Sequence, residues 1–354
     1  MKLKTIKEGN IKLKIPVEKE LTKKMSVFYN PEMKFDRDLS ELIISILKPK
    51  KICDCFAASG ARGLRYKSVL KDSEVVLNDH NLKAVELIEK NAGLNKLKVR
   101  IESKDANKLL FENLFNLIDL DPFGSPIYFL NSAAKSIKNK GIVAMTATDT
   151  APLCGTSPLT CLRRYGIKSL KTDFYKELGL RIFISSAMKI FSMYDMAFTP
   201  IFSYCRKHYF RIFGQVTRGC KRTDSLLEQF DYISYCQKCG FHKTGLIDKC
   251  DNCGNKLNLI GKIFTGNFAS PEFCMKLEKE SNKKFNYLSD FINQIKVEQD
   301  YFMYYDIHKI CKWNGKQIKK KKFLLEKLEG CKTHFLDTGI KTNKPFSEIL
   351  KVFD

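Results

Sequence analysis

The chain has 354 residues, of which 44% are hydrophobic, and a formal net charge of +23. This length and apolar content exclude an intrinsically disordered chain and predict a sizeable core divided over two or three domains. No run of about 18 uncharged apolar residues is present and the start of the chain lacks a signal-peptide core, so we expect a soluble cytoplasmic protein with no membrane partner. The excess of lysine and arginine favours a polyanionic partner such as a nucleic acid.

The first part of the chain alternates between predicted strands and helices. A β-hairpin is expected over residues 3–15, around Glu8-Gly9-Asn10, and a helix at 39–47 with Asp36 as its N-cap. Further strands are predicted at 51–56, 74–78, 99–102, 114–120 and 142–147, and helices at 61–70, 82–91 and 127–137. This order predicts an α/β fold with a doubly wound, Rossmann-like parallel sheet.

The second part of the chain is expected to differ in composition. Residues 168–194 predict a long helix, and residues 197–216 predict a pair of strands. After Gly266 the sequence becomes rich in lysine and aromatic residues at helical spacing. We therefore divide the chain into a domain of residues 1–265 and a smaller helical or α+β domain of residues 266–354.

The segment with the most chemical information is the apolar run 114–120, which ends at Asp121-Pro122-Phe123-Gly124. Pro122 removes a backbone donor and Gly124 permits a sharp turn. We therefore expect the Asp121 carboxylate and the Phe123 ring to project from the carboxyl edge of a buried strand, which is the edge where open α/β sheets bind ligands. An ordinary Asx turn at a strand end is the alternative.

Other predicted strand ends carry groups that suit an adenosyl ligand. The first strand of the sheet ends in residues 54–63, a turn of small residues that enters a helix, where a ligand could approach backbone N–H groups at the helix N-terminus. Asp79 follows the second strand and could accept both ribose hydroxyls, whereas Asp105 and Ala106 follow the third strand, in position for an adenine edge. Each acid alone is more often a turn residue, but with Asp121 they form a coherent set.

Four of the thirteen cysteines have the spacing of a metal site, and the others follow no pairing pattern, which suits a reducing compartment. The two Cys-x-x-Cys pairs are Cys236 with Cys239 and Cys250 with Cys253, each followed by a glycine, Gly240 and Gly254. Two such knuckles predict a zinc ribbon with a structural Zn²⁺ and no open coordination position. A redox dithiol pair is the alternative. We expect His242, between the pairs, to be an exposed loop residue, although it could replace a ligand.

Seven short segments, taken together, are more specific than any single motif. They are residues 27–31, 58–63, 119–126, 148–155, 161–166, 333–335 and 338–342. In this order they resemble the tRNA (guanine-26-N2)-dimethyltransferase family, and the chain resembles its compact archaeal members. The acid, proline and aromatic at 121–123 also resemble the Asp/Asn-Pro-Pro-aromatic motif of methyltransferases that modify exocyclic base amines.

The resemblance implies a cofactor, a substrate and a set of site residues. It implies S-adenosylmethionine held by Arg37, Arg62, Asp79, Asp105 and Ala106. It also implies that Asp121 lies at the chemistry and that Phe28, Pro122 and Phe123 surround the target base. We therefore expect a monomeric enzyme that transfers two methyl groups to the exocyclic N2 of guanine 26 in tRNA. The base would be extruded, and Asp121 would hold and deprotonate the amine.

Two other functions stay open on the sequence alone. One is a DNA adenine-amine methyltransferase, whose motif usually carries Asn and a second Pro in place of Asp121 and Phe123. The other is a zinc-ribbon RNA-binding protein with an inactive methyltransferase fold, although the intact Asp79, Asp105 and Asp121 weigh against decay.

The C-terminal region combines aromatic residues at 301–305 with a lysine run at 319–322. This combination predicts a small helical domain that grips tRNA. The alternative is that the tyrosines are core residues and the lysines form a solvated helix face.

Overall fold

The computed structural model describes residues 2–17 and 25–354, and two compact units alternate along the chain. The first unit comprises Met1–Ala147, Phe213–Arg218 and Lys276–Ser289. The second unit comprises Thr148–Ile212, Gly219–Met275 and Asp290–Asp354. Among the described residues, no helix combines the length and the apolar character needed to cross a membrane.

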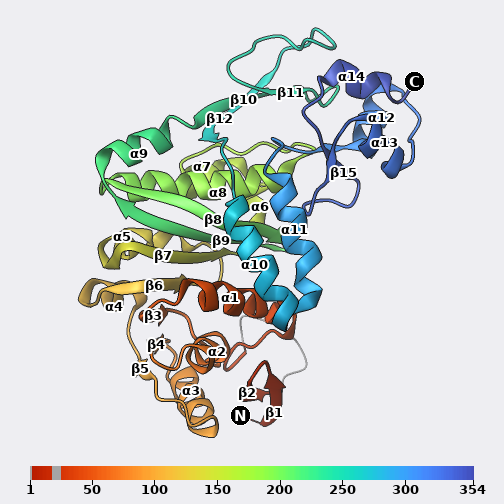
Figure 1. Cartoon of the computed structure of the whole chain (residues 1–354). Coiled ribbons are helices and arrows are strands. Elements are labelled where there is room, and N and C mark those ends of the chain that lie inside the picture. Colours follow the sequence, from red (N-terminus) through yellow and green to blue (C-terminus); the bar gives the residue numbers. More distant parts are fainter. Residues whose placement is uncertain (1, 18–24) are drawn as a thin grey trace. The chain divides into compact units, whose positions relative to one another are not determined.

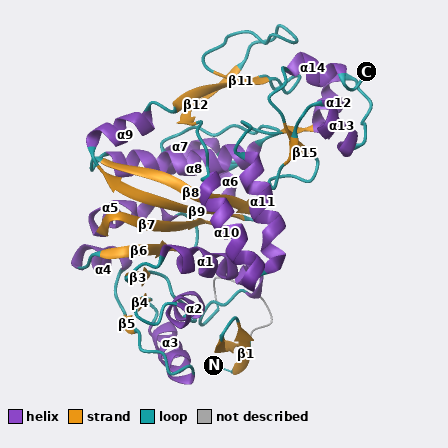
Figure 2. Cartoon of the chain, viewed as in Figure 1, coloured by secondary structure: helices purple, strands orange, loops and turns teal. Residues whose placement is uncertain are grey.

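The first unit contains the N-terminal hairpin and the successive strands and helices predicted from the sequence (Figures 1 and 2). Its strands are β1 (Leu3–Glu8), β2 (Ile11–Pro16), β3 (Lys51–Asp54), β4 (Glu74–Asn78), β5 (Arg100–Glu102), β6 (Phe115–Leu120) and β7 (Ile137–Ala147). Its α-helices are α1 (Lys34–Leu47), α2 (Ala61–Val69), α3 (Leu82–Leu94), α4 (Ala106–Glu112) and α5 (Leu130–Ser136), and η1 (Pro31–Met33), η2 (Pro126–Phe129) and η3 (Asn286–Leu288) are 3₁₀ turns.

A seven-stranded sheet has the order β5-β4-β3-β6-β7-β9-β8, in which β8 is Met196–Arg206 and β9 is Tyr209–Arg218. The pairs from β5 to β7 are parallel. Only two residues separate β8 from β9, so these neighbouring strands run antiparallel and the sheet is mixed. The Rossmann-like parallel strands and the N-terminal hairpin are observed as predicted, and the pair of strands expected over residues 197–216 extends the same sheet as β8 and β9.

The second unit contains the long helix, the cysteine pairs and the C-terminal helices. Its helices are α6 (Thr150–Leu153), α7 (Pro158–Tyr165), α8 (Tyr175–Ser192), α9 (Cys220–Leu227), α11 (Ser289–Glu298), α12 (Ile307–Asn314), α13 (Lys321–Lys327) and α14 (Phe346–Lys351), and α10 (Pro271–Lys284) is divided between the units. Its short strands are β10 (Phe230–Tyr235), β11 (His242–Thr244), β12 (Asn258–Phe264), β13 (Tyr305–Asp306), β14 (Cys331–Lys332) and β15 (Gly339–Lys341).

Two expectations about helices are wrong. Asp36 is not an N-cap: α1 begins at Lys34, and Asp36 is fully buried in its first turn. The long helix begins at Tyr175 rather than at residue 168, and it tolerates Gly179 in its interior. A Cβ atom at Gly179 would lie 2.8 Å from the ring of Phe210, so close packing of the helix favours glycine there.

The hairpin is attached to the first helices through the buried carboxylate of Glu8. Arg37 donates to both of its oxygens, at 2.6 and 2.7 Å, and Arg65 donates at 3.0 Å. The Tyr29 hydroxyl adds a fourth bond at 2.6 Å. Burial alone would raise the pKa of Glu8, but the hydrogen bonds and the attraction from Arg37 outweigh burial and lower it to about 2. The ionised form of Glu8 therefore stabilises the folded state.

This geometry predicts a pH-dependent effect of Glu8→Gln on stability. Because the folded pKa of Glu8 is depressed, its contribution is present above about pH 4.5 and is lost as the pH falls towards 2. We expect the variant to lose about 3 kcal/mol of unfolding free energy at pH 7 and to approach the wild type below pH 3. Thermal unfolding of both proteins across this range measures the difference.

Glu112→Gln is the matched control, since Glu112 pairs with Lys104 at an exposed position and should contribute little. An equal loss of stability for Glu8→Gln at pH 7 and at pH 3 would contradict the charge-dependent role.

Candidate active site

The end of β6 places two acids on one side of the strand. Asp119 lies within β6 and Asp121 directly follows it, and residues two apart in a strand face the same way. Asp119 is fully buried, whereas the side chain of Asp121 is 21% exposed. The chain turns at Gly124, whose φ of 88° lies in the left-handed region that glycine adopts most readily. Asp121 therefore stands where the buried strand reaches an accessible edge.

A buried arginine, Arg62 on α2, holds these acids. Its Nη2 donates to Asp121 at 2.5 Å, its Nη1 lies 2.6 Å from Asp36, and its Nε lies 3.9 Å from Asp119. Nη1 also donates to the Ser40 hydroxyl at 2.9 Å. Burial would lower the pKa of Arg62, but attraction from Asp36, Asp119 and Asp121 holds it well above its usual value. The guanidinium is thus a permanent cation shared by three carboxylates.

A fourth acid, Asp54 at the end of β3, belongs to the same buried group. Its carboxylate accepts a hydrogen bond of 3.0 Å from the Gly63 amide. Burial, and then repulsion from Asp119, raise the pKa of Asp54 to about 7. Both effects favour the neutral form of Asp54 over the form that a solvated carboxyl group adopts. The Tyr66 hydroxyl donates to the Asp119 carboxylate at 2.7 Å and so fixes its orientation.

Two phenylalanines 95 positions apart in the sequence meet at this site. The rings of Phe28 and Phe123 lie 4.8 Å apart, edge to face, at an interplanar angle of 80°. Phe123 is 50% exposed. Val27, beside Phe28, packs with Ala84 and Leu87 of α3, which anchors the backbone that presents the Phe28 ring. Phe123, two residues after Asp121, therefore presents an accessible aromatic surface.

The turn of small residues and Asp79 form one hydrogen-bonded unit. The backbone N–H of Ala58 donates to Asp79 Oδ2 at 2.9 Å, and the N–H of Asn81 donates to Oδ1 at 3.0 Å. The side chain of Asp79 keeps 14% exposure. Behind the turn, a Cβ atom at Gly63 would lie 1.9 Å from Leu77, so glycine alone lets α2 approach β4 so closely. The turn and the acid are thereby held at the carboxyl edge of the sheet.

The remaining candidate residues lie in two different settings. Asp105 is the exposed N-cap of α4 and accepts from the Lys108 amide at 3.1 Å, while Ala106 is buried in the first turn. Arg37 is bound to Glu8 through Nε and Nη2. Nη2 also donates to the Asn30 carbonyl at 3.1 Å, and Nη1 makes no hydrogen bond within residues 2–17 and 25–354.

Sequence reasoning missed several residues that organise the site. Asp36 was taken for a helix cap, and Asp54, Tyr66 and Asp119 were assigned no role. Asp119 carried a usable signal, because its position two residues before Asp121 places both on one face of a strand. The others carried none, since they come from separate elements that only the folded sheet brings around Arg62.

The four predicted cysteines gather in the second unit. Their Sγ atoms all lie within 4.8 Å of one another, and the Cys236–Cys253 and Cys239–Cys250 pairs are 3.5 Å apart. Four sulfurs around one Zn²⁺ lie about 3.8 Å apart when each Zn–S bond is roughly 2.3 Å. Gly240 and Gly254 adopt φ angles of 86° and 68° in the knuckle turns. The donor set therefore fits a tetrahedral metal ion.

The expectation of an exposed His242 is wrong. His242 begins β11 and is only 7% exposed, because its ring stacks on Tyr305 at 4.3 Å and packs against Phe174 at 4.6 Å. Burial lowers its pKa to about 4. Within the described part of the chain, the cluster that could hold a metal ion consists of the four cysteines, and His242 does not belong to it.

Comparison with known proteins gives one consistent family. The model of the N2,N2-dimethylguanosine tRNA methyltransferase family matches residues 9–354. The chain is 38% identical to a tRNA (guanine(26)-N(2))-dimethyltransferase of Sulfurisphaera tokodaii, over 99% of this chain and 98% of that protein. It is 34% identical to the tRNA (guanine(26)-N(2)/guanine(27)-N(2))-dimethyltransferase of Aquifex aeolicus, over 99% and 95%.

A solved structure agrees with the sequence comparisons. Trm1 from Pyrococcus horikoshii, in complex with S-adenosyl-L-methionine, is similar to this chain with a TM-score of 0.89 and 30% identity, over 99% of this chain and 100% of that one. These matches confirm the resemblance carried by the seven sequence segments and decide against the DNA adenine-amine alternative. The chain belongs to the N2,N2-dimethylguanosine tRNA methyltransferase family.

Proposed function

We propose that this protein transfers methyl groups from S-adenosylmethionine to the exocyclic N2 of guanine 26 in tRNA, and that it does so twice. The observation that carries the mechanism is the ion pair between Arg62 and Asp121 at the end of β6. Two residues after Asp121 in the sequence, the ring of Phe123 contacts that of Phe28. A fixed carboxylate and an accessible aromatic surface are what methylation of an extruded base amine requires.

S-adenosylmethionine would supply an electrophilic methyl group on a sulfonium centre. We assign the ribose hydroxyls to Asp79, whose partly exposed carboxylate is held by Ala58 and Asn81. Asp105 and Ala106, at the N-terminus of α4, suit the adenine edge. Arg37 can offer its Nη1 to the methionine carboxylate. The close approach of α2 to β4 at Gly63 supports this assignment, because it holds the turn beside Asp79 at the edge of the sheet.

For Arg62 we propose an indirect part, in contrast to the direct cofactor contact that the resemblance implies. Its guanidinium is engaged with Asp36, Asp119 and Asp121, so it serves chiefly to hold the acid in place. An acid fixed before substrate arrives loses little entropy in the reaction.

Asp121 would act on the amine itself. The N2 lone pair of guanine is delocalised into the ring, so the amine is a poor nucleophile until one of its protons is held. The Asp121 carboxylate would accept that N2–H, and it would take or relay the proton as positive charge develops on nitrogen. We assign the second N2–H to a backbone carbonyl near Pro122. After one transfer a single N2–H remains, which permits a second cycle.

The target base must leave the folded core of tRNA before it can react. Extrusion costs about a few kcal/mol, and stacking on an aromatic ring offsets it. Phe123 is the more accessible ring of the pair, and Phe28 supports it edge to face. We therefore assign the stacking contact to Phe123 and the support to Phe28.

The cysteine cluster would hold a structural Zn²⁺ that braces part of the second unit. Cys236, Cys239 and Cys250 belong to an apolar cluster with residues of α12, α13 and α14. The side-chain amide of Asn314, the last residue of α12, donates to the Cys239 carbonyl at 3.0 Å. The metal would thus stabilise the segments that carry the lysine run.

We propose that the C-terminal region, residues 266–354, contributes to tRNA binding. Lys320 and Lys322 are exposed at the start of α13, as an electrostatic contact with phosphates requires. Tyr304 and Tyr305 are buried, so these two tyrosines are core residues and not stacking platforms. The domain boundary near residue 266, the monomeric state and the cytoplasmic location stay predictions.

Replacing Asp121 tests the proposed chemistry. Asp121→Ala should lower the single-turnover rate of methyl transfer by at least roughly 10²-fold, because the general base and the electrostatic stabilisation are both lost. Asp121→Asn should be intermediate, since its amide oxygen can accept the N2–H but cannot take the proton. Equilibrium binding of cofactor and of tRNA should change little. Asp72→Ala, at an exposed acid elsewhere in the first unit, is the control. Transfer by Asp121→Ala within a fewfold of wild type would refute the assignment.

Phe123→Ala should act differently from the Asp121 variants. It raises the cost of holding the base extruded, so both tRNA affinity and the methylation rate should fall, while Phe123→Tyr and Phe123→Trp should be milder. Phe111→Ala removes another exposed phenyl ring, 58% accessible on α4, and serves as the comparison. The stacking role is wrong if Phe123→Ala binds and methylates tRNA as Phe111→Ala does.

The zinc proposal predicts one tightly held zinc ion per chain. Cys236→Ser or Cys250→Ser should lower the thermal stability and reduce the metal content, while cofactor binding largely persists. Cys220→Ser, at an exposed cysteine outside the cluster, should change neither. Elemental analysis of protein purified without added metal measures the stoichiometry. A value near zero, with all four thiols freely titratable, would exclude the structural metal.

A further inference from the structure

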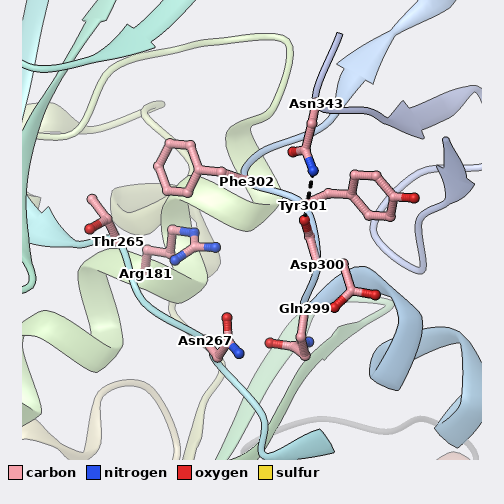
Figure 3. Close-up of a pocket in the computed structure, with 8 residues that line it drawn as sticks. All are labelled: Arg181, Thr265, Asn267, Gln299, Asp300, Tyr301, Phe302 and Asn343. Atoms are coloured by element: carbon pink, nitrogen blue, oxygen red, sulfur yellow. Dashed lines mark hydrogen bonds between the residues drawn. The ribbon is translucent and has the colours of Figure 1, made fainter. Parts of the chain in front are cut away.

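A small polar pocket lies wholly within the second unit (Figure 3). Its volume is about 190 Å³, and its lining includes Arg181, Thr265, Asn267, Asp300, Phe302 and Asn343. Sites for drug-sized ligands usually measure roughly 300–1,000 Å³, so this pocket suits a smaller group. Asp121 and the aromatic pair belong to the first unit, so the pocket is not part of the methylation site proposed above.

The floor of the pocket is a buried arginine against an aromatic ring. Arg181 is 2% exposed, and its guanidinium lies 4.6 Å from the centre of the Phe302 ring. Nε and Nη2 donate to Glu177, and Nη1 donates to the carbonyls of Phe264 and Gly266. These bonds leave one Nη2–H without an acceptor among the described residues. Figure 3 shows the guanidinium directed into the space that the other lining side chains surround.

The charge of Arg181 is balanced inside the protein. Glu177 also binds the fully buried Lys341 at 2.9 Å, and Lys341 lies 3.6 Å from Glu298. Two cations and two carboxylates therefore form a network with no net charge. The pocket lacks the excess positive charge that a phosphate site requires, and it carries a further carboxylate, Asp300, at its rim.

The rim offers hydrogen-bonding groups that the protein leaves unused. The exposed side chains of Asn267 and Asp300 make no hydrogen bond within residues 2–17 and 25–354. Asn343 is fixed, because its amide donates to the Asp300 carbonyl at 3.0 Å (Figure 3). A ligand in the pocket would thus meet one N–H donor from Arg181, one carboxylate acceptor and a side-chain amide that can do either.

We propose that this pocket binds a single unstacked base of the tRNA, one that carries a carbonyl next to a ring N–H, which is guanine or uracil. The Arg181 N–H would donate to the carbonyl, and Asp300 would accept the ring N–H. The Phe302 ring provides an aromatic surface of the kind on which single-stranded bases stack. This inference rests on the proposed function, since it names a second contact with the same tRNA.

Asn267→Ala and Asp300→Asn test the pocket without disturbing the buried network. Asn267→Ala should weaken binding of an unmodified tRNA transcript by about tenfold, the typical effect of one lost base contact, and Asp300→Asn should weaken it less, since its amide oxygen can still accept the ring N–H. The salt dependence of binding should keep its slope, because no phosphate contact is removed, whereas replacing Lys320 and Lys322 by alanine should flatten it. Affinity for S-adenosylmethionine should stay that of the wild type. Asn293→Ala and Asp337→Asn, at exposed positions outside the pocket, are matched controls.

A series of transcripts, each with one abasic nucleotide outside position 26, identifies the base. Wild-type protein should lose affinity for one transcript in which a guanine or uracil is removed, and Asp300→Asn should show no further loss on that transcript. The proposal is overturned if both pocket variants bind like their controls, or if the abasic penalty is unchanged in Asp300→Asn. A wild-type protein that binds tRNA but transfers no methyl group would refute the proposed function, and the binding series would still decide the pocket.

Discussion

The first unit depends on one buried cation, the guanidinium of Arg62. It lies on α2 and joins Asp36 of α1 to Asp119 and Asp121 at the end of β6. Removing one partner of a buried ion pair costs about 3–5 kcal/mol, because the other charge is left uncompensated in a poorly solvated place. The arrangement therefore ties the accessible acid to the core of the sheet. Asp121 is held by the same contact that holds α1 and α2 against the strands.

The second unit also contains a network of buried ion pairs, which takes no part in the proposed chemistry. Arg181 and Lys341 share Glu177, and His334 contacts Glu298 at 2.8 Å. These residues come from α8, α11 and the C-terminal segment, so the network joins parts of the chain that are more than 150 residues apart. A buried network with balanced charges favours one arrangement of these segments over others. It also leaves the pocket beside Arg181 polar but without a net positive charge.

Much of the fold was predictable because its signals are local. The apolar run before Asp121 matches β6, the hairpin around Gly9 matches β1 and β2, and the cysteine spacing anticipated the four-sulfur cluster. Two of the errors have a common cause. Asp36 has the composition of a helix cap and His242 that of an exposed loop residue, but each is buried by a partner distant in sequence, Arg62 for the first and Tyr305 for the second. Tertiary contacts outweighed local preference at both positions.

The sequence by itself determined the sheet strands, the order of acids at their carboxyl ends, the metal-binding spacing and the family signature, because each is written in residues that are close along the chain. Only the tertiary structure decided which residues meet. It brought Phe28 to Phe123, placed four acids around Arg62, and assembled the pocket at Arg181 from separate segments. Such contacts depend on how the helices and strands pack together, and a periodic pattern of apolar residues fixes which face is buried but not which partner buries it.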